Sequence, residues 1–152
     1  MDAKQFIETW EIHNRINLYL LKAIKEEYLT DISASKGRNV GEQFAHKHNV
    51  RLMWLKAADP GLLKGQNKIE MDTTISKKLL TVELTKSAKA ISTLLEKGFE
   101  EGKVKGFKPH PAAFFGYLIS HGDSYSSYQR YAIFIFGISS ATVVETGKRT
   151  PG

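Results

Sequence analysis

Apolar residues recur along most of the chain with the spacing of an α-helix. Between Phe6 and Tyr28 they follow one another at intervals of three and four residues, which places them on one helical face. The pattern predicts a first helix over this range, with the apolar face directed into a core. The predicted core face consists of Ile12, Ile16, Tyr19, Leu20, Ala23 and Ile24.

A second helix is predicted from Asn39 to about Ala58. Asn39 can act as the N-cap, and Glu42, three residues later, can accept a hydrogen bond from the backbone N–H of the cap. Pro60 ends the helix because proline has no amide donor. The predicted apolar arc of this helix consists of Phe44, Val50, Met53 and Trp54.

The connection after this helix is long enough to cross a bundle from end to end. Residues 59–73 can reach roughly 50 Å when extended, whereas a helix of about 20 residues is only about 30 Å long. We therefore expect the second and third helices to run in the same direction. The third helix is predicted from Thr74 to Glu101, with Gly102 as its C-cap. Its apolar repeat consists of Ile75, Leu79, Val82, Ala90, Ile91, Leu94 and Leu95.

The fourth predicted helix, from Pro111 to about Gly137, is the most apolar segment of the chain. Pro109 and Pro111 suit its first turn, where the backbone amides have no helical partner. Apolar and aromatic residues cover nearly all of its sides, which is typical of a buried helix. Among the last residues, 139–152, the segment ATVVETG is too short to assign, and TGKRTPG at 146–152 is predicted to form a frayed tail.

Four long helices and one long connection predict an all-α fold, a four-helix bundle with a long crossover between helices 2 and 3. The length of 152 residues is that of one domain, and no shift in composition marks a boundary. We therefore expect a single domain over residues 1–152. The cores of such bundles commonly hold metal or cofactor sites built from facing helices.

Composition narrows the classes of function. The chain has no cysteine, which excludes disulfides, thiolate metal sites and a cysteine nucleophile. We expect a cytoplasmic protein without a membrane partner, because the start of the chain lacks a signal peptide and no apolar run approaches about 20 residues. The net charge of +6 is spread along the chain, so no nucleic acid partner is expected.

Histidines are the residues most able to carry chemistry here, since neutral imidazole binds divalent metals readily. His46 and His48 point about 200° apart on a helix, so they cannot both face one ion. The apolar arc does not decide which of them faces inward. His13 is predicted to be partly exposed on the first helix, and His110 to lie at the start of the fourth.

Several motifs occur in a recognisable order. VGEQFAH at 40–46 leads to RLMWL at 51–55, the loop GKVKGFKP occupies 102–109, and AFFGYLISH covers 113–121. Together they resemble the DinB-like family of metal-binding bundles. The resemblance implies an up-down-down-up bundle that holds a divalent metal with three histidines, one on helix 2 and two, four residues apart, on helix 4.

By this resemblance, His46 and His121 are metal ligands, and Tyr125 occupies the position of the third histidine. His121 and Tyr125 are four residues apart and can reach the same point from one helical face. A phenol has a pKa near 10 against about 6.5 for imidazole, so offering a phenolate at pH 7 costs about 4 kcal/mol unless the metal compensates. We therefore expect a weakened site for zinc, nickel or manganese.

Two functions follow from the resemblance and remain open. The first is a metal-dependent hydrolase or small-thiol transferase that acts on a small-molecule substrate and uses the weakened metal site. The alternative is a non-catalytic homodimer of helical bundles that binds a small apolar ligand or partner, with a vestigial metal site. The catalytic residues and the substrate are not defined by the sequence.

Overall fold

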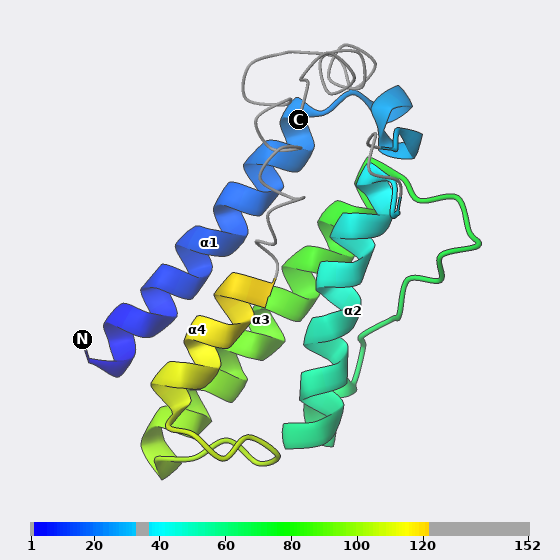
Figure 1. Cartoon of the computed structure of the whole chain (residues 1–152). Helices are drawn as coiled ribbons and strands as arrows, with labels where there is room; N and C mark the ends of the chain where they lie inside the picture. Colours follow the sequence, from blue (N-terminus) through cyan, green and yellow to red (C-terminus); the bar gives the residue numbers. More distant parts are fainter. Residues whose placement is uncertain (1, 33–36, 122–152) are drawn as a thin grey trace, which may run out of the picture.

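A computed structural model describes residues 2–32 and 37–121 of the chain, and within these ranges it is all-helical. Four α-helices and two short 3₁₀-helices form the described part, with no strand in it (Figure 1). The prediction of an all-α helical bundle is therefore confirmed. No helix in the described ranges is both long and apolar enough to cross a membrane.

The first helix, α1 (Ala3–Ala23), begins at the N-cap Asp2, whose carboxylate accepts a hydrogen bond from the Gln5 N–H at 2.9 Å. It ends earlier than predicted because Ile24 is in an extended conformation. The chain then forms a separate 3₁₀-helix, η1 (Glu26–Thr30). The predicted helix over residues 6–28 is therefore two elements that meet at Ile24.

The second helix, α2 (Val40–Ala58), begins and ends where the sequence predicts. The Asn39 side chain accepts from the Glu42 N–H, and the Asn39 N–H donates to the Glu42 carboxylate, both at 2.8 Å. These two bonds satisfy amide groups that have no partner within the helix. Pro60 opens a short 3₁₀-helix, η2 (Pro60–Leu63), directly after α2.

The connection after η2 runs back along α2 to the end at which α2 begins. Asn67 contacts His48, Ile69 is bonded to Asn49, and Ile75 lies against Gly41 at the start of the helix. A Cβ at Gly41 would lie 3.3 Å from both the Ile75 side chain and the Leu29 carbonyl, so this contact favours glycine. The next helix therefore begins beside the start of α2, and the two run in the same direction (Figure 1).

This third helix, α3 (Lys77–Glu101), starts at the N-cap Ser76 and ends at Gly102, which has a φ of +69°. A left-handed conformation of this kind favours glycine, as predicted. The fourth helix, α4 (Pro111–His121), starts at the predicted proline. The rest of the predicted fourth helix, up to Gly137, and the predicted tail lie outside the described residues.

The core formed by the described residues contains two apolar clusters, one at each end of the bundle. The first includes Trp10, Leu55 and Phe114, and the second includes Leu21, Phe44 and Leu80. Between them lie buried polar residues from three helices, which we call the polar layer. Its members are Asn14, Asn17, His48, Arg51, Glu83 and Ser87.

The predicted core face of the first helix is wrong at its centre. Tyr19 is 74% exposed, and Ile12 and Ile16 are also exposed. The predicted Leu20 and Ile24 are buried, but the rest of the buried face carries Trp10, Asn14, Asn17 and Leu21. Two asparagines of the polar layer occupy core positions on this face. The apolar spacing therefore indicated the opposite, exposed face of the helix as the core face. Met53 of α2 and Val82 of α3, both predicted as part of apolar faces, are exposed as well.

Candidate functional site

The polar layer decides which histidine of α2 faces inward. The buried face of α2 includes Phe44, His48, Arg51 and Leu55, spaced by three or four residues. His48 is fully buried, whereas His46 lies on the flank of this face and is partly exposed. The question that the sequence left open is thus answered by burial.

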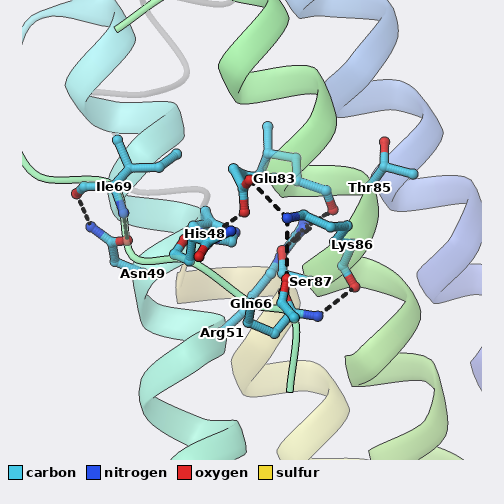
Figure 2. A network of polar contacts seen from close by, with 12 residues as sticks. His48, Asn49, Arg51, Gln66, Ile69, Glu83, Thr85, Lys86 and Ser87 are labelled. Atoms are coloured by element: carbon cyan, nitrogen blue, oxygen red, sulfur yellow. Dashed lines mark hydrogen bonds and ion pairs between the residues drawn. The ribbon is translucent and has the colours of Figure 1, made fainter. Parts of the chain in front are cut away.

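His48 bridges α2 to the crossover connection and to α3. Its Nε2 lies 2.6 Å from the Asn67 carbonyl oxygen and 3.9 Å from a carboxylate oxygen of Glu83 (Figure 2). Burial lowers the pKa of His48, and this effect outweighs the Asn67 carbonyl and the Glu83 charge, which act in the opposite direction. The imidazole is therefore neutral at pH 7, with Nε2–H donating to Asn67.

Glu83 is the acidic member of the polar layer. Its carboxylate lies 2.9 Å from the Lys86 ammonium, which also donates to the Gly65 carbonyl at 3.1 Å. The Gln66 side chain donates in turn to the Lys86 carbonyl at 3.2 Å. These bonds attach the crossover connection to α3 (Figure 2).

The lowered pKa of His48 makes the stability of the bundle sensitive to acid. Between the folded pKa and the ordinary value of 6.5, the unfolded chain binds a proton that the native chain does not. The contribution of His48 to stability is therefore complete above pH 6.5 and declines as the pH falls through that window. We expect His48→Gln to flatten the fall in unfolding free energy measured by urea denaturation between pH 7 and 5.

His110→Asn provides the control for this pH measurement. His110 is exposed, and its Nδ1 accepts from the Ala112 N–H at the start of α4, a capping bond that asparagine can also make. This variant removes one imidazole but should keep the pH slope of the parent. Equal slopes for the parent and His48→Gln would contradict the assignment of the acid sensitivity to His48.

A small cavity opens beside the polar layer, between α1, α2 and α4. Its volume is about 20 Å³, enough for one water-sized group. Residues of all three helices line it: Trp10, His13, His46, Lys47, Val50, Arg51 and Leu118. The cavity thus brings together one predicted ligand, His46, and a second histidine, His13, that the sequence analysis placed outside the metal site.

The other two predicted ligands are located only in part. His121 is the last residue of α4 and is described by its backbone, and Tyr125 lies outside the described residues. Leu118 lines the cavity, and position 121 follows it by one helical turn on the same face. No group of three or more histidine, aspartate or glutamate side chains able to hold a metal occurs in the described ranges. The ligand set His46, His121 and Tyr125 stays a prediction.

The charge of the lining bears on whether a metal fits. Among the residues that the structure describes, the lining includes no carboxylate, but it includes the cations Lys47 and Arg51. The Lys47 ammonium donates to the side-chain oxygen of Asn17 at 2.8 Å, which links α2 to α1. A dication held by imidazoles at this cavity would therefore meet like charges, so the electrostatic surroundings do not favour a metal.

Two residues of this site were missed by the sequence analysis. Trp10 is 1% exposed and donates from Nε1 to the Ala88 carbonyl at 3.0 Å. Arg51 lies with its guanidinium carbon 4.9 Å from the Trp10 ring. A signal was available, because Arg51 follows the apolar Phe44 by seven residues and therefore shares its helical face.

Comparison with known proteins finds no counterpart for this chain. No family model matches it, and neither a curated protein nor a solved structure is significantly similar. The likeness of its motifs to the DinB-like family therefore has no support from these comparisons. Any assignment of function must be argued from the cavity and the residues that line it.

Proposed function

We propose that the chain is a DinB-like protein that acts on a small molecule in the cavity between α1, α2 and α4, as a metal-dependent hydrolase or small-thiol transferase. One observation supports this proposal above others. His46 of α2 lines the same cavity as Leu118 of α4, and Leu118 precedes His121 by one helical turn. The parallel course of α2 and α3 agrees with the up-down-down-up topology of that family.

In this proposal, His46 and His121 hold a divalent ion, with Tyr125 as a weak third ligand. Such an ion supplies the lowered pKa that makes a water or a thiol nucleophilic near neutral pH. Trp10 forms an apolar wall of the cavity and keeps solvent from it. Lys47 and Arg51 orient the substrate by their charges.

The proposal is tested by metal binding to protein purified without an affinity tag. After treatment with EDTA and dialysis, zinc, nickel and manganese are each titrated by calorimetry, and the native metal content is measured by elemental analysis. We expect one weak site per chain, and His46→Ala should lower its affinity by at least about tenfold, because it removes a direct ligand. His121→Ala should have the same effect.

His110→Asn serves here as the matched control, since it removes an exposed histidine that does not line the cavity. Its affinity for each metal should equal that of the parent. Absence of metal from the purified protein, together with no binding of any of the three ions, would refute the metal-dependent function.

The alternative function, a non-catalytic homodimer that binds a small apolar ligand or partner, draws on a different observation. Ile12, Ile16 and Tyr19 place exposed apolar side chains on one face of α1. Exposed apolar side chains gathered on one face are typical of an interaction surface. This alternative predicts that His46→Ala and His121→Ala leave function intact.

A further inference from the structure

Arg51 is a cation enclosed by the helices of the bundle. It is 4% exposed, and the Trp10 ring covers one side of its guanidinium. A single terminal nitrogen, Nη1, donates to the Leu84 carbonyl at 3.1 Å and to the Ser87 hydroxyl at 3.2 Å. Both bonds tie Arg51 to α3 and fix the position of the guanidinium (Figure 2).

No carboxylate within the described ranges forms an ion pair with Arg51. The acidic member of the polar layer, Glu83, is ion-paired with Lys86, and its carboxylate also lies 3.9 Å from the neutral imidazole of His48. Burial lowers the pKa of Arg51 to about 9, so the side chain is still charged at neutral pH. A buried charge without a counter-ion is costly, and proteins keep such a charge mainly where something else balances it.

The remaining donors of Arg51 suit a particular kind of ligand. Among the described residues, Nε and Nη2 have no acceptor, and together they form one edge of the planar guanidinium. Such an edge matches two oxygens of a carboxylate or a phosphate. Arg51 also lines the cavity, as does Lys47, while no acidic side chain within residues 2–32 and 37–121 does so.

We propose that the cavity binds the anionic group of a small-molecule ligand, a carboxylate or a phosphate, on the buried guanidinium of Arg51. The volume of about 20 Å³ is enough for one water-sized group, so an oxygen of the anion enters the cavity and the rest of the ligand extends outward. The low polarity around Trp10 strengthens the ion pair, because a charge pair interacts more strongly away from water.

This inference rests on the proposed function only in placing the ligand in the same cavity. It needs no metal. An anion held by Arg51 would also offset the charges that oppose a dication beside His46, so the two proposals agree with each other. They make separate predictions, however, and they fail separately.

The test is a titration of the ¹⁵N-labelled protein, followed by the Nε–H resonance of Arg51 and the indole N–H resonance of Trp10. Sodium phosphate and sodium acetate are added in separate arms, in EDTA and at constant ionic strength adjusted with chloride. We expect a saturable shift of both resonances with at least one anion. The arm with the lower dissociation constant identifies the class of ligand.

Three variants locate the binding. Arg51→Met should raise the dissociation constant by at least about tenfold, followed on the Trp10 signal, because it removes the charge and the donors together. Arg51→Lys keeps the charge but loses the planar edge, so it should also weaken binding, and it serves if Arg51→Met does not fold. Lys56→Met removes an exposed charge of the same helix and should change the constant by less than about twofold.

Three outcomes would overturn the inference. They are no saturable shift with either anion, equal binding by the parent and the folded Arg51 variants, and binding that appears only after zinc is added. The last result would support the proposed metal site while it assigns the anion to the ion rather than to Arg51. A positive result in EDTA, with no metal binding in the calorimetric test, would keep the anion site and refute the metal-dependent function.

Discussion

Replacing Trp10 with alanine is expected to lower the free energy of unfolding by about 3–5 kcal/mol, the usual cost of removing a large buried ring. Trp10 is 1% exposed and belongs to the apolar cluster that includes Leu55 and Phe114. Its loss leaves a cavity between α1 and α3 and exposes one side of the buried Arg51 guanidinium. Urea denaturation at pH 7.5 measures the effect.

Two controls separate the packing of Trp10 from its other contacts. Trp10→Phe keeps most of the ring but loses the hydrogen bond to the Ala88 carbonyl, so we expect a smaller loss of about 1–2 kcal/mol. Met53→Ala, at an exposed position of α2, should change stability by less than about 0.5 kcal/mol. A loss below about 1 kcal/mol for Trp10→Ala would show that the ring is not part of the core.

The second large effect is expected at Lys86, although this side chain is partly exposed. Lys86→Met leaves the Glu83 carboxylate, which is 5% exposed, without the ammonium that lies 2.9 Å from it. The other group near that carboxylate, His48, is held neutral by burial. Because a buried charge is then unpaired, we expect unfolding free energy to fall by about 3 kcal/mol at pH 7.5.

The reverse substitution should be much milder. Glu83→Leu leaves Lys86, which can turn its ammonium to solvent, so we expect a change of about 1 kcal/mol or less. The double variant Lys86→Met with Glu83→Leu should recover most of the stability lost in Lys86→Met alone. Lys89→Met removes an exposed charge of the same helix and serves as the control. A double variant no more stable than Lys86→Met would contradict this account.

The ends of the helices could be predicted because their signals are local. Asn39 with Glu42, Pro60, Gly102 and Pro111 each act through backbone groups within one turn, and each marks a boundary within a residue or two of the observed one. The start of α3 was predicted less accurately: the helix begins at Lys77, three residues after the predicted Thr74. The break at Ile24 was missed because the apolar spacing continues through it to Tyr28.

The inward faces could not be predicted equally well. Apolar spacing locates a core face only where that face is apolar, as at the two clusters. Between the two clusters, the buried positions are occupied by polar side chains such as Asn14, His48 and Glu83. Apolar spacing assigns polar side chains to the surface. This explains why exposed Ile12, Ile16 and Tyr19 were taken for a core face.

The candidate site was likewise predicted only in part from the sequence. Histidine chemistry and the order of the motifs pointed to His46, which lines the cavity, while His121 and Tyr125 remain predictions. Arg51 was found only from the structure. Its importance depends on the Trp10 ring, on the α3 groups that receive its bonds and on the lack of a paired carboxylate among the described residues.

For this protein, the sequence by itself determined the all-helical class, most helix limits and a connection long enough to cross the bundle, because these depend on neighbouring residues and on the length of the chain. Only the tertiary structure decided that His48 rather than His46 is buried, that polar side chains divide the core, and that Arg51 faces a cavity. The physical reason is that a polar residue is stable inside only where groups distant in the sequence bond to it, and such partners leave no local pattern.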